Sequence, residues 1–248
     1  AGWTNALDFN ADGSLLAGAS LHGDIGVWSS STGEPVAVLE GHGDRAPVNV
    51  SVPTERESGE IFTTLRVNDL AWRPAYGTLI SAGFDGSVRE WDLVTGRGTV
   101  LHQFEHEAYN LAISPDGERL VAIDRSGTTV EIDLDDGGVA RRWEKTSSAL
   151  SLVFSPDGRF LAGAGQVGAL LWDAESGRIV RDFEGSVYRP SGVVFTGGGS
   201  ELLVASGEGV IRGYHLDPVD LVELAREKVS RELTEEECQE YLRRSCDG

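Results

Sequence analysis

The glycine-rich segment 163–168 is the clearest candidate for cofactor chemistry in this sequence. Its residues, Gly-Ala-Gly-Gln-Val-Gly, have the GxGxxG spacing with which dinucleotide-binding loops approach a pyrophosphate. Such a loop works where it leads into a helix, because the helix N-terminus stabilises the phosphate charge. Here the next residues are Ala-Leu-Leu-Trp, an apolar run that predicts a strand. We therefore expect no nucleotide site and no cofactor.

Three groups of residues resemble metal ligands, and each has a simpler explanation. Residues 133–137, Asp-Leu-Asp-Asp-Gly, begin like a calcium loop but lack the closing Glu, so we interpret them as a turn. His102 and His106 fall in a predicted strand and loop, where we expect a solvated pair. Cys238 and Cys246 have no partner residues for zinc, so we interpret them as thiols. The sequence predicts no metal site.

A repeated pattern must position any functional side chains. Five apolar segments are each followed by a turn, and their last residues are Phe9, Trp72, Ile113, Phe154 and Phe195. The intervals between these residues are 63, 41, 41 and 41 positions. About 19 residues after each comes a second large side chain, in order Trp28, Trp91, Ile132, Trp172 and Tyr214. β-Branched and apolar runs bounded by Gly and Asp turns lie between the two markers. The pattern predicts about four antiparallel strands in each of five units.

These units resemble the WD-repeat β-propeller family, whose repeats open after Gly-His and end in Trp-Asp. The matching segments are Gly41-His42, Trp91-Asp92, Trp172-Asp173, the degenerate Ile132-Asp133 and the Ser-Pro-Asp-Gly turns at 114–117 and 155–158. The resemblance covers residues 1–216. It implies an all-β fold, a β-propeller of four-stranded antiparallel blades, with five recognisable blades in an incomplete ring. Members of the family most often have seven blades, so the resemblance implies about two more upstream.

The resemblance also implies a buried polar set. In that family a His, a Ser or Thr, an Asp and the Trp of one blade are linked by hydrogen bonds. The second unit supplies all four, as His42, Ser81, Asp85 and Trp91. The first and third units replace the Ser and the Asp, with Gly18, His22, Ala122 and Ser126. We therefore expect one blade to be tied by the full polar set.

The longest interval, 63 residues, contains a surplus that we interpret as an inserted β-hairpin at about 43–66. It follows Gly41-His42, so it should lie near the face at which members of that family bind partners. Its positive side chains are Arg45, Arg56 and Arg66. They could orient an acidic or carboxylate-bearing partner on an otherwise acidic chain. The alternative is a decorative loop whose arginines neutralise neighbouring glutamates.

Residues just before each inner strand should rim one mouth of the central channel. Aromatic and Arg side chains dominate binding hot spots. The contact candidates are Trp3, Asn5, Arg66, Asn68, Tyr109, Tyr188 and Arg189. Packing between blades is their alternative role. We interpret the chain as a non-catalytic scaffold or sensor that binds a protein or peptide partner.

Charge excludes several classes of partner. The 40 acidic and 21 basic side chains give a formal net charge of −19, which repels nucleic acid and acidic lipid. No apolar run approaches the roughly 20 residues of a membrane span. Without a signal peptide, a cytoplasmic location is predicted. The acid excess is spread along every unit, which is typical of a solvated surface; a hydrolase or lyase with an acidic channel site is the alternative function.

Residues 217–248 change from strand-like to helical periodicity. Pro218 stands at a first helical position, and 234–237, Thr-Glu-Glu-Glu, form a capping box. We predict a C-terminal helical tail. It resembles the ends of large actinobacterial multidomain signalling proteins, in which a STAND-type ATPase, kinase or transcriptional regulator precedes WD repeats. That resemblance implies upstream domains in the same bacterial polypeptide.

Overall fold

The computed structural model describes residues 4–20, 22–42, 66–143, 149–165, 168–183 and 190–216. The predicted hairpin at 43–66, apart from Arg66, and the predicted tail at 217–248 lie outside these residues. The described part contains five antiparallel sheets, and the strands of each sheet are neighbours in chain order. The predicted all-β fold is confirmed.

The first three sheets have four strands each. The first sheet comprises β1 (Thr4–Phe9), β2 (Leu15–Ser20), β3 (Ile25–Ser29) and β4 (Pro35–Leu39). The second comprises β5 (Val67–Trp72), β6 (Leu79–Gly83), β7 (Ser87–Trp91) and β8 (Gly98–Gln103). The third comprises β9 (Ala108–Ile113), β10 (Arg119–Asp124), β11 (Thr129–Asp133) and β12 (Val139–Trp143).

The last two sheets differ in strand number. The fourth comprises β13 (Ala149–Phe154), β14 (Phe160–Gly165), β15 (Gly168–Asp173) and β16 (Ile179–Asp182). The fifth has three described strands, β17 (Pro190–Thr196), β18 (Glu201–Ser206) and β19 (Ile211–His215), with a short 3-10 turn at Gly197–Gly199. Of the glycine-rich segment 163–168, Gly163 and Gly165 lie in β14 and Gly168 begins β15, so a strand follows the segment as the sequence predicts.

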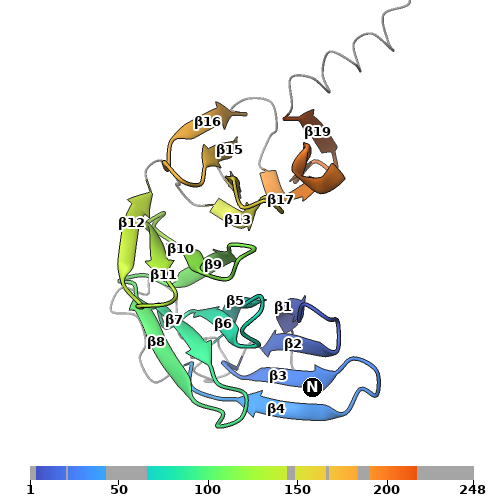
Figure 1. Cartoon of the computed structure of the whole chain (residues 1–248), viewed down its shortest axis with the longest axis vertical. Coiled ribbons are helices and arrows are strands. Elements are labelled where there is room, and N and C mark those ends of the chain that lie inside the picture. The colour runs from blue at the N-terminus through green and yellow to red at the C-terminus, as the bar shows by residue number, and fades with distance from the viewer. Residues whose placement is uncertain are drawn as a thin grey trace, which may run out of the picture.

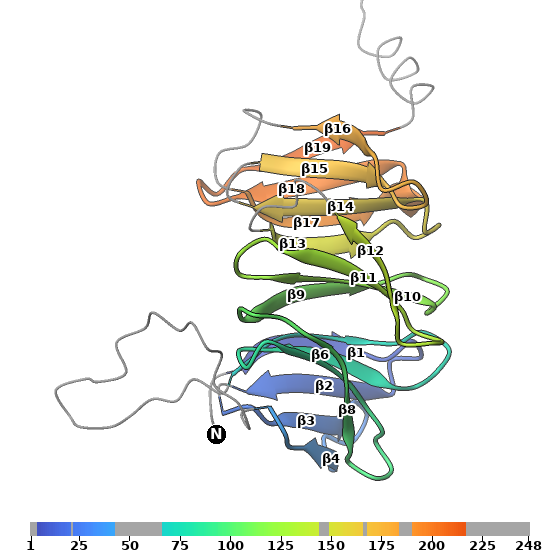
Figure 2. The same cartoon turned by 90° about the vertical axis from the view of Figure 1, so that its left-hand side faces the viewer.

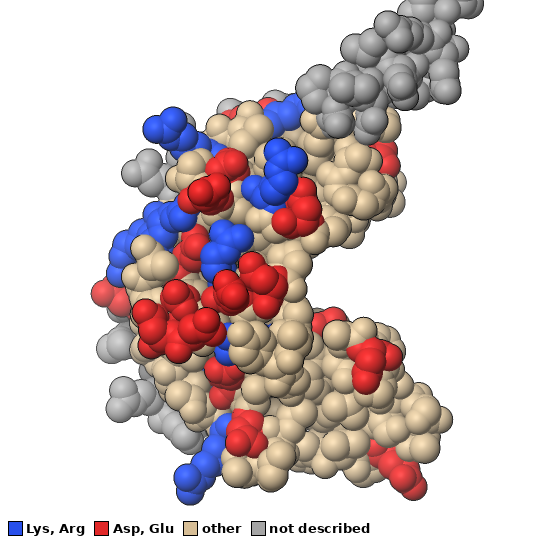
Figure 3. Space-filling model, in the orientation of Figure 1, with Lys and Arg blue, Asp and Glu red and all other residues tan. Residues whose placement is uncertain are grey.

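The five sheets stand like blades around a common centre, with the first strand of each sheet innermost (Figure 1). Each inner strand lies next to the inner strand of the following sheet, in the order β1, β5, β9, β13 and β17. Seen from the side, the blades follow one another along the arc (Figure 2). The arc stays open between the first and last sheets, and the space-filling view shows the same opening (Figure 3). The expected incomplete ring of blades is therefore observed.

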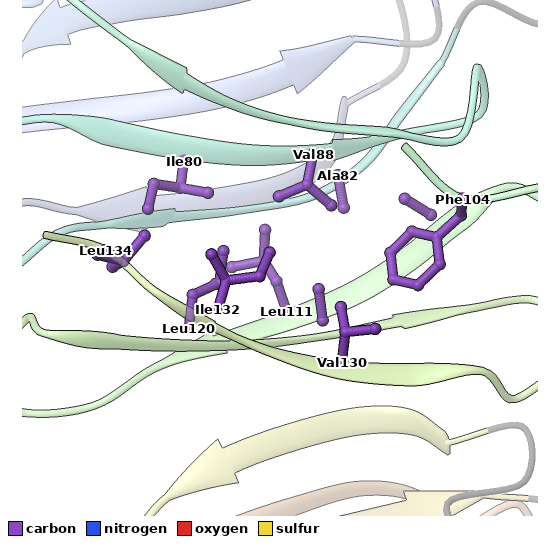
Figure 4. Close-up of a cluster of buried hydrophobic side chains, with 11 residues drawn as sticks. Ile80, Ala82, Val88, Phe104, Leu111, Leu120, Val130, Ile132 and Leu134 are labelled. Carbon is purple, nitrogen blue, oxygen red and sulfur yellow. The ribbon is translucent and has the colours of Figure 1, made fainter. Parts of the chain in front are cut away.

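Four apolar clusters join the successive sheets. Between the second and third sheets, Ile80, Ala82 and Val88 pack against Leu111 and Ile132, as Figure 4 shows. Between the first and second sheets, small side chains of one face meet large ones of the next, and the cluster contains Ala17, Ala19, Leu70, Trp72 and Trp91. Burial of these faces holds the arc together, because each sheet covers the apolar face of its neighbour.

One sheet face has no described neighbour. Leu7 and Phe9 of β1 are 63% and 55% exposed, whereas Leu70 and Trp72, their counterparts in β5, are 5% and 6% exposed. Each pair is a leucine and an aromatic residue, so the difference comes from the first sheet's lack of a described neighbour on this face. The apolar residues of an inner strand are therefore buried or exposed according to whether another sheet packs on that face.

Candidate functional site

A β-bulge recurs near the start of every inner strand. In each blade one residue is skipped in the pairing with the second strand, and the skipped residues are Asn5, Asn68, Tyr109, Leu150 and Ser191. A bulge leaves its extra residue outside the ladder and re-aims that side chain. Three predicted contact residues are bulge residues, so they belong to the inner strands and do not precede them. The prediction that these three residues lie just before the inner strands was therefore wrong, whereas Arg66 does directly precede β5.

The bulges of the first three blades border a cavity of about 430 Å³ at the channel mouth. Its lining residues are Asn5, Ala6, Leu7, Arg66, Asn68, Asp69, Tyr109 and Asn110. All four described contact candidates are among them. The other three, Trp3, Tyr188 and Arg189, lie outside the described residues. The structure thus brings side chains from the first three blades to one pocket, which we call the mouth pocket.

Two asparagines of the mouth pocket also join blades. The Asn5 side-chain amide donates from Nδ2 to the carbonyl oxygen of Val67 at 3.2 Å. Asn68 repeats this bond one blade further, to the carbonyl of Ala108 at 2.7 Å. Packing between blades and lining the pocket are therefore compatible roles. Because Nδ2 is fixed in both residues, Oδ1 is the end of each amide left to accept a hydrogen bond.

Asp69 and Asn110 form a polar relay that the sequence analysis missed. Asp69 Oδ2 accepts hydrogen bonds from Asn110 Nδ2 at 2.7 Å and from the Leu111 N–H at 3.0 Å, and Oδ1 accepts from the Leu70 N–H. Asn110 Oδ1 in turn accepts from the Leu152 N–H at 2.7 Å. The relay links the second, third and fourth blades. A polar residue directly follows the bulge residue in the second, third and fourth blades, whereas Ala6 and Gly192 stand there in the first and fifth.

Burial has the largest effect on the pKa of Asp69, the acidic residue of this relay. Burial raises the pKa of Asp69 to about 7, although the N–H groups of Leu111 and Leu70 favour the charged form. The folded chain therefore holds a proton that the unfolded chain releases above pH 4. This contribution to the free energy of unfolding falls as the pH rises toward the folded pKa.

We expect Asp69 to make stability fall with rising pH. Between pH 6 and pH 7 the unmodified chain should lose about 1 kcal/mol more unfolding free energy than Asp69→Asn, which has no carboxyl to titrate. Urea denaturation of both proteins at pH 5, 6, 7 and 8 measures the difference. Parallel pH profiles would show that Asp69 is already ionised in the folded chain.

Arg66 brings positive charge to the mouth pocket. Its guanidinium lies over the ring of Phe84, with Cζ 5.1 Å from the ring centroid. Its Nε is buried and has no hydrogen-bond partner among the described residues. The hydroxyl of Tyr109, a residue that lines the same pocket, makes no hydrogen bond within the described part of the chain. A guanidinium carries five N–H donors and a phenol carries one O–H donor, so both side chains can donate hydrogen bonds to a bound molecule.

The lining of the mouth pocket bears on the hydrolase or lyase alternative. Among the described lining residues, Asp69 is the one carboxyl group and there is no histidine. Both Asp69 oxygens accept hydrogen bonds from the chain itself. The described lining residues therefore do not include a pair of acid and base groups of the kind that hydrolysis at this pocket would require.

The second blade contains a connected polar set beneath its outer surface. The structure brings together the four residues His42, Ser81, Asp85 and Trp91. His42 Nδ1 lies 3.0 Å from Asp85 Oδ1, and His42 Nε2 lies 2.6 Å from Ser81 Oγ. Trp91 Nε1 donates to the same Ser81 oxygen at 2.7 Å. A side chain at position 83 would collide with His42 and Asp85, so this position requires glycine.

Asp85 is the charged centre of this set. Burial alone would raise its pKa, but the hydrogen bonds and charge of His42 and the hydrogen bonds of Ser87 lower it to about 2. In the first blade, Gly18 stands where the second has Ser81, and a Cβ there would lie 3.0 Å from the Trp28 ring. That indole lies over the glycine, in contrast to the hydrogen-bonded indole of Trp91.

His102 and His106 lie in β8 and in the turn after it, and both line a second cavity of about 310 Å³. Burial and the charge of Arg142 lower the pKa of His102. Across the described residues, no group of three potential ligands could hold a metal ion. Asp133 accepts the Asp135 N–H at 2.9 Å, as in a turn. Cys238 and Cys246 lie outside the residues that the structure describes.

Comparison with known proteins gives a partial match to one family. Residues 59–92 match the family model described as "WD domain, G-beta repeat". The chain is 27% identical over 147 residues to the rice protein "Small ribosomal subunit protein RACK1y", covering 56% of this chain and 44% of that protein. It is 27% identical over 177 residues to "WD repeat-containing protein SL1-17" of Schistosoma mansoni, covering 71% and 52%.

A third similarity is to "Eukaryotic translation initiation factor 3 subunit I" of Aspergillus fumigatus, at 27% identity over 138 residues, 54% of this chain and 34% of that protein. The chain thus spans about half or less of the length of these relatives. Within the described residues, no helix has the length and apolar character needed to span a bilayer. The matched repeat, the relatives and the five blade-like sheets together make this chain similar to WD40-repeat β-propeller proteins.

Proposed function

We propose that this chain is a non-catalytic interaction scaffold and that a protein or peptide partner binds at the mouth pocket. One observation carries the proposal: three bulges turn Asn5, Asn68 and Tyr109 out of the strand ladders toward one cavity. Bulges at a sheet edge are a common way to aim side chains at a ligand. The packed blades hold these side chains on a stiff support, which reduces the entropy lost on binding.

The relatives support a general scaffold function. WD40 propellers typically act as protein-interaction scaffolds, and the names of two relatives describe subunits of larger assemblies. Charge supports a protein partner over nucleic acid or membrane, because the formal net charge is −19. Figure 3 shows acidic and basic side chains scattered over the visible face. A sensor role, a cytoplasmic location and attachment to a larger bacterial signalling protein remain predictions from the sequence.

Affinity capture with a single-residue variant tests the proposal. The unmodified chain, Tyr109→Ser and the control Val94→Ser should be immobilised and exposed to lysate of the source organism. Val94 is 96% exposed on a turn away from the pocket. We expect at least one protein to be captured by the unmodified chain and the control, and to fall at least tenfold with Tyr109→Ser. The purified partner should then show the same tenfold loss in calorimetry.

Identical captured sets for the three proteins would remove the mouth pocket from partner binding. A loss with Val94→Ser as well as Tyr109→Ser would have the same consequence, since the effect would not depend on the pocket. Melting temperatures of the three chains should agree, because Tyr109 makes no hydrogen bond through its hydroxyl within the described structure.

A further inference from the structure

We propose that the mouth pocket binds an acidic side chain of the partner. Its carboxylate would accept hydrogen bonds from Arg66 and Tyr109, while N–H groups of the adjoining peptide would donate to Asn5 and Asn68. This inference rests on the proposed function and specifies the chemistry of the partner. It follows from the charge of Arg66, from the hydrogen bonds that occupy Asp69, which is the one carboxyl group among the described lining residues, and from the direction of the two amides.

Arg66 differs from the other arginines that the fold shields from water. Among the described residues, four more arginines are buried or half-buried, and each is ion-paired with an acid: Arg73 with Glu90, Arg89 with Asp85, and Arg119 and Arg141 with Glu131. Arg66 is half-buried and has no such partner in that part of the chain. A shielded guanidinium without an acid is a site of unsatisfied charge. Within the described structure, Arg66 is therefore available to pair with an external anion.

The acid nearest in the lining does not fill this role. Asp69 accepts hydrogen bonds from Asn110 Nδ2 and from the N–H groups of Leu70 and Leu111, which occupy both of its oxygens. No ion pair joins Asp69 to Arg66 in the described structure. The blades thus use Asp69 to hold one another, and the guanidinium remains available to a ligand.

The remaining walls suit a residue within a peptide. Oδ1 of Asn5 and of Asn68 can accept peptide N–H groups, because each Nδ2 is already bonded to a carbonyl of the next blade. Leu7, which is 63% exposed, offers an apolar wall for the methylene groups of an acidic side chain. A cavity of about 430 Å³ lies within the size range of small ligand sites. Donors for the carboxylate and acceptors for the backbone therefore line the same space.

NMR of the Arg66 side chain tests the inference directly. The Nε–H signal is assigned by its loss in Arg66→Lys of the ¹⁵N-labelled chain. The probes are N-acetyl-glutamate N-methylamide and its matched neutral analogue, N-acetyl-glutamine N-methylamide. We expect the glutamate probe to shift the signal in a saturable way, with an affinity at least tenfold higher than that of the glutamine probe. Charge-assisted hydrogen bonds to guanidinium account for this preference.

Variants separate specific binding from general charge attraction. Because the Arg66 variant lacks the Nε–H signal, the backbone amide shifts of Asn68 and Tyr109 are used to measure binding to it. Arg66→Gln should lower the affinity for the glutamate probe at least tenfold, whereas Arg97→Gln, on an exposed turn, should leave it unchanged. An equal loss in both variants would overturn the inference, and so would equal affinities for the two probes or no saturable shift. Binding of O-phosphoserine amide with no glutamate response would also overturn it and indicate a phosphorylated partner.

The outcome is distinguishable from failure of the proposed function. If glutamate does not bind but Tyr109→Ser still abolishes partner capture, the scaffold function stands and the acidic preference is wrong. If glutamate binds and capture does not depend on Tyr109, the acidic site exists but the proposed docking surface does not.

Discussion

Replacing Asp85 with alanine should lower the free energy of unfolding by about 3 kcal/mol, since the change breaks a buried polar network at its charged centre. Asp85 Oδ1 lies 3.0 Å from His42 Nδ1 and accepts hydrogen bonds from the N–H and the hydroxyl of Ser87. Arg89 Nη2 lies 3.6 Å from Asp85 Oδ2. Alanine would leave these donors shielded from water without their acceptor. Urea denaturation at pH 7 measures the loss.

The matched control is Glu105→Ala, which removes an exposed carboxylate near the end of the same blade. Its midpoint should stay close to that of the unmodified chain. Because the folded pKa of Asp85 lies below the unfolded value, its contribution should persist above pH 4 and disappear as the pH falls toward 2. A loss equal to that of Glu105→Ala would mean that the set contributes no more than a surface group.

Replacing Arg73 with alanine should lower the unfolding free energy by a similar amount, about 3 kcal/mol. Arg73 is 7% exposed and joins the second and third blades. Its Nε donates to the carbonyl oxygen of Gly117 at 2.7 Å, and its two terminal nitrogens reach Glu90 and Asp135 at 3.4 and 2.9 Å. Its guanidinium lies 3.6 Å from the Tyr76 ring centroid, so the variant also loses stacking.

Two further substitutions test the geometry of this contact. Arg73→Lys should recover less than half of the loss, because an ammonium group cannot reproduce the planar fork that reaches three acceptors. Arg97→Ala, on an exposed turn of the same blade, should have little effect on the urea midpoint. Full recovery with lysine would show that charge alone, without the fork, accounts for the contribution of Arg73.

The repeated part of the fold could be predicted because the relevant signal is local. The alternation that buries Leu70 and Trp72 occurs within six residues, and its 41-residue repetition predicts the number of sheets. The bulges could not be predicted, because skipping Asn68 changes no residue type and is visible only in the pairing of β5 with β6. The four described contact residues therefore line one pocket, although Asn5, Asn68 and Tyr109 lie within the inner strands and not just before them.

The missed residues act across distances that sequence patterns do not encode. Asp69 and Asn110 look like isolated polar residues in apolar strands, and their bond joins residues 41 positions apart. Arg73 replaces the serine that begins the turns of the third and fourth units, and its acceptor at Gly117 is 44 positions away. Only the packing of one blade on the next brings these groups into contact.

The recurrent bulge gives each blade one position that takes no part in the strand ladder, so its residue type is free of the alternation that the apolar faces require. The five blades place asparagine, asparagine, tyrosine, leucine and serine there. In the first two blades the asparagine also donates a hydrogen bond to the next blade, whereas the Tyr109 hydroxyl makes no such bond within the described residues. A substitution at Tyr109 can therefore change what the mouth pocket recognises without breaking a hydrogen bond between blades.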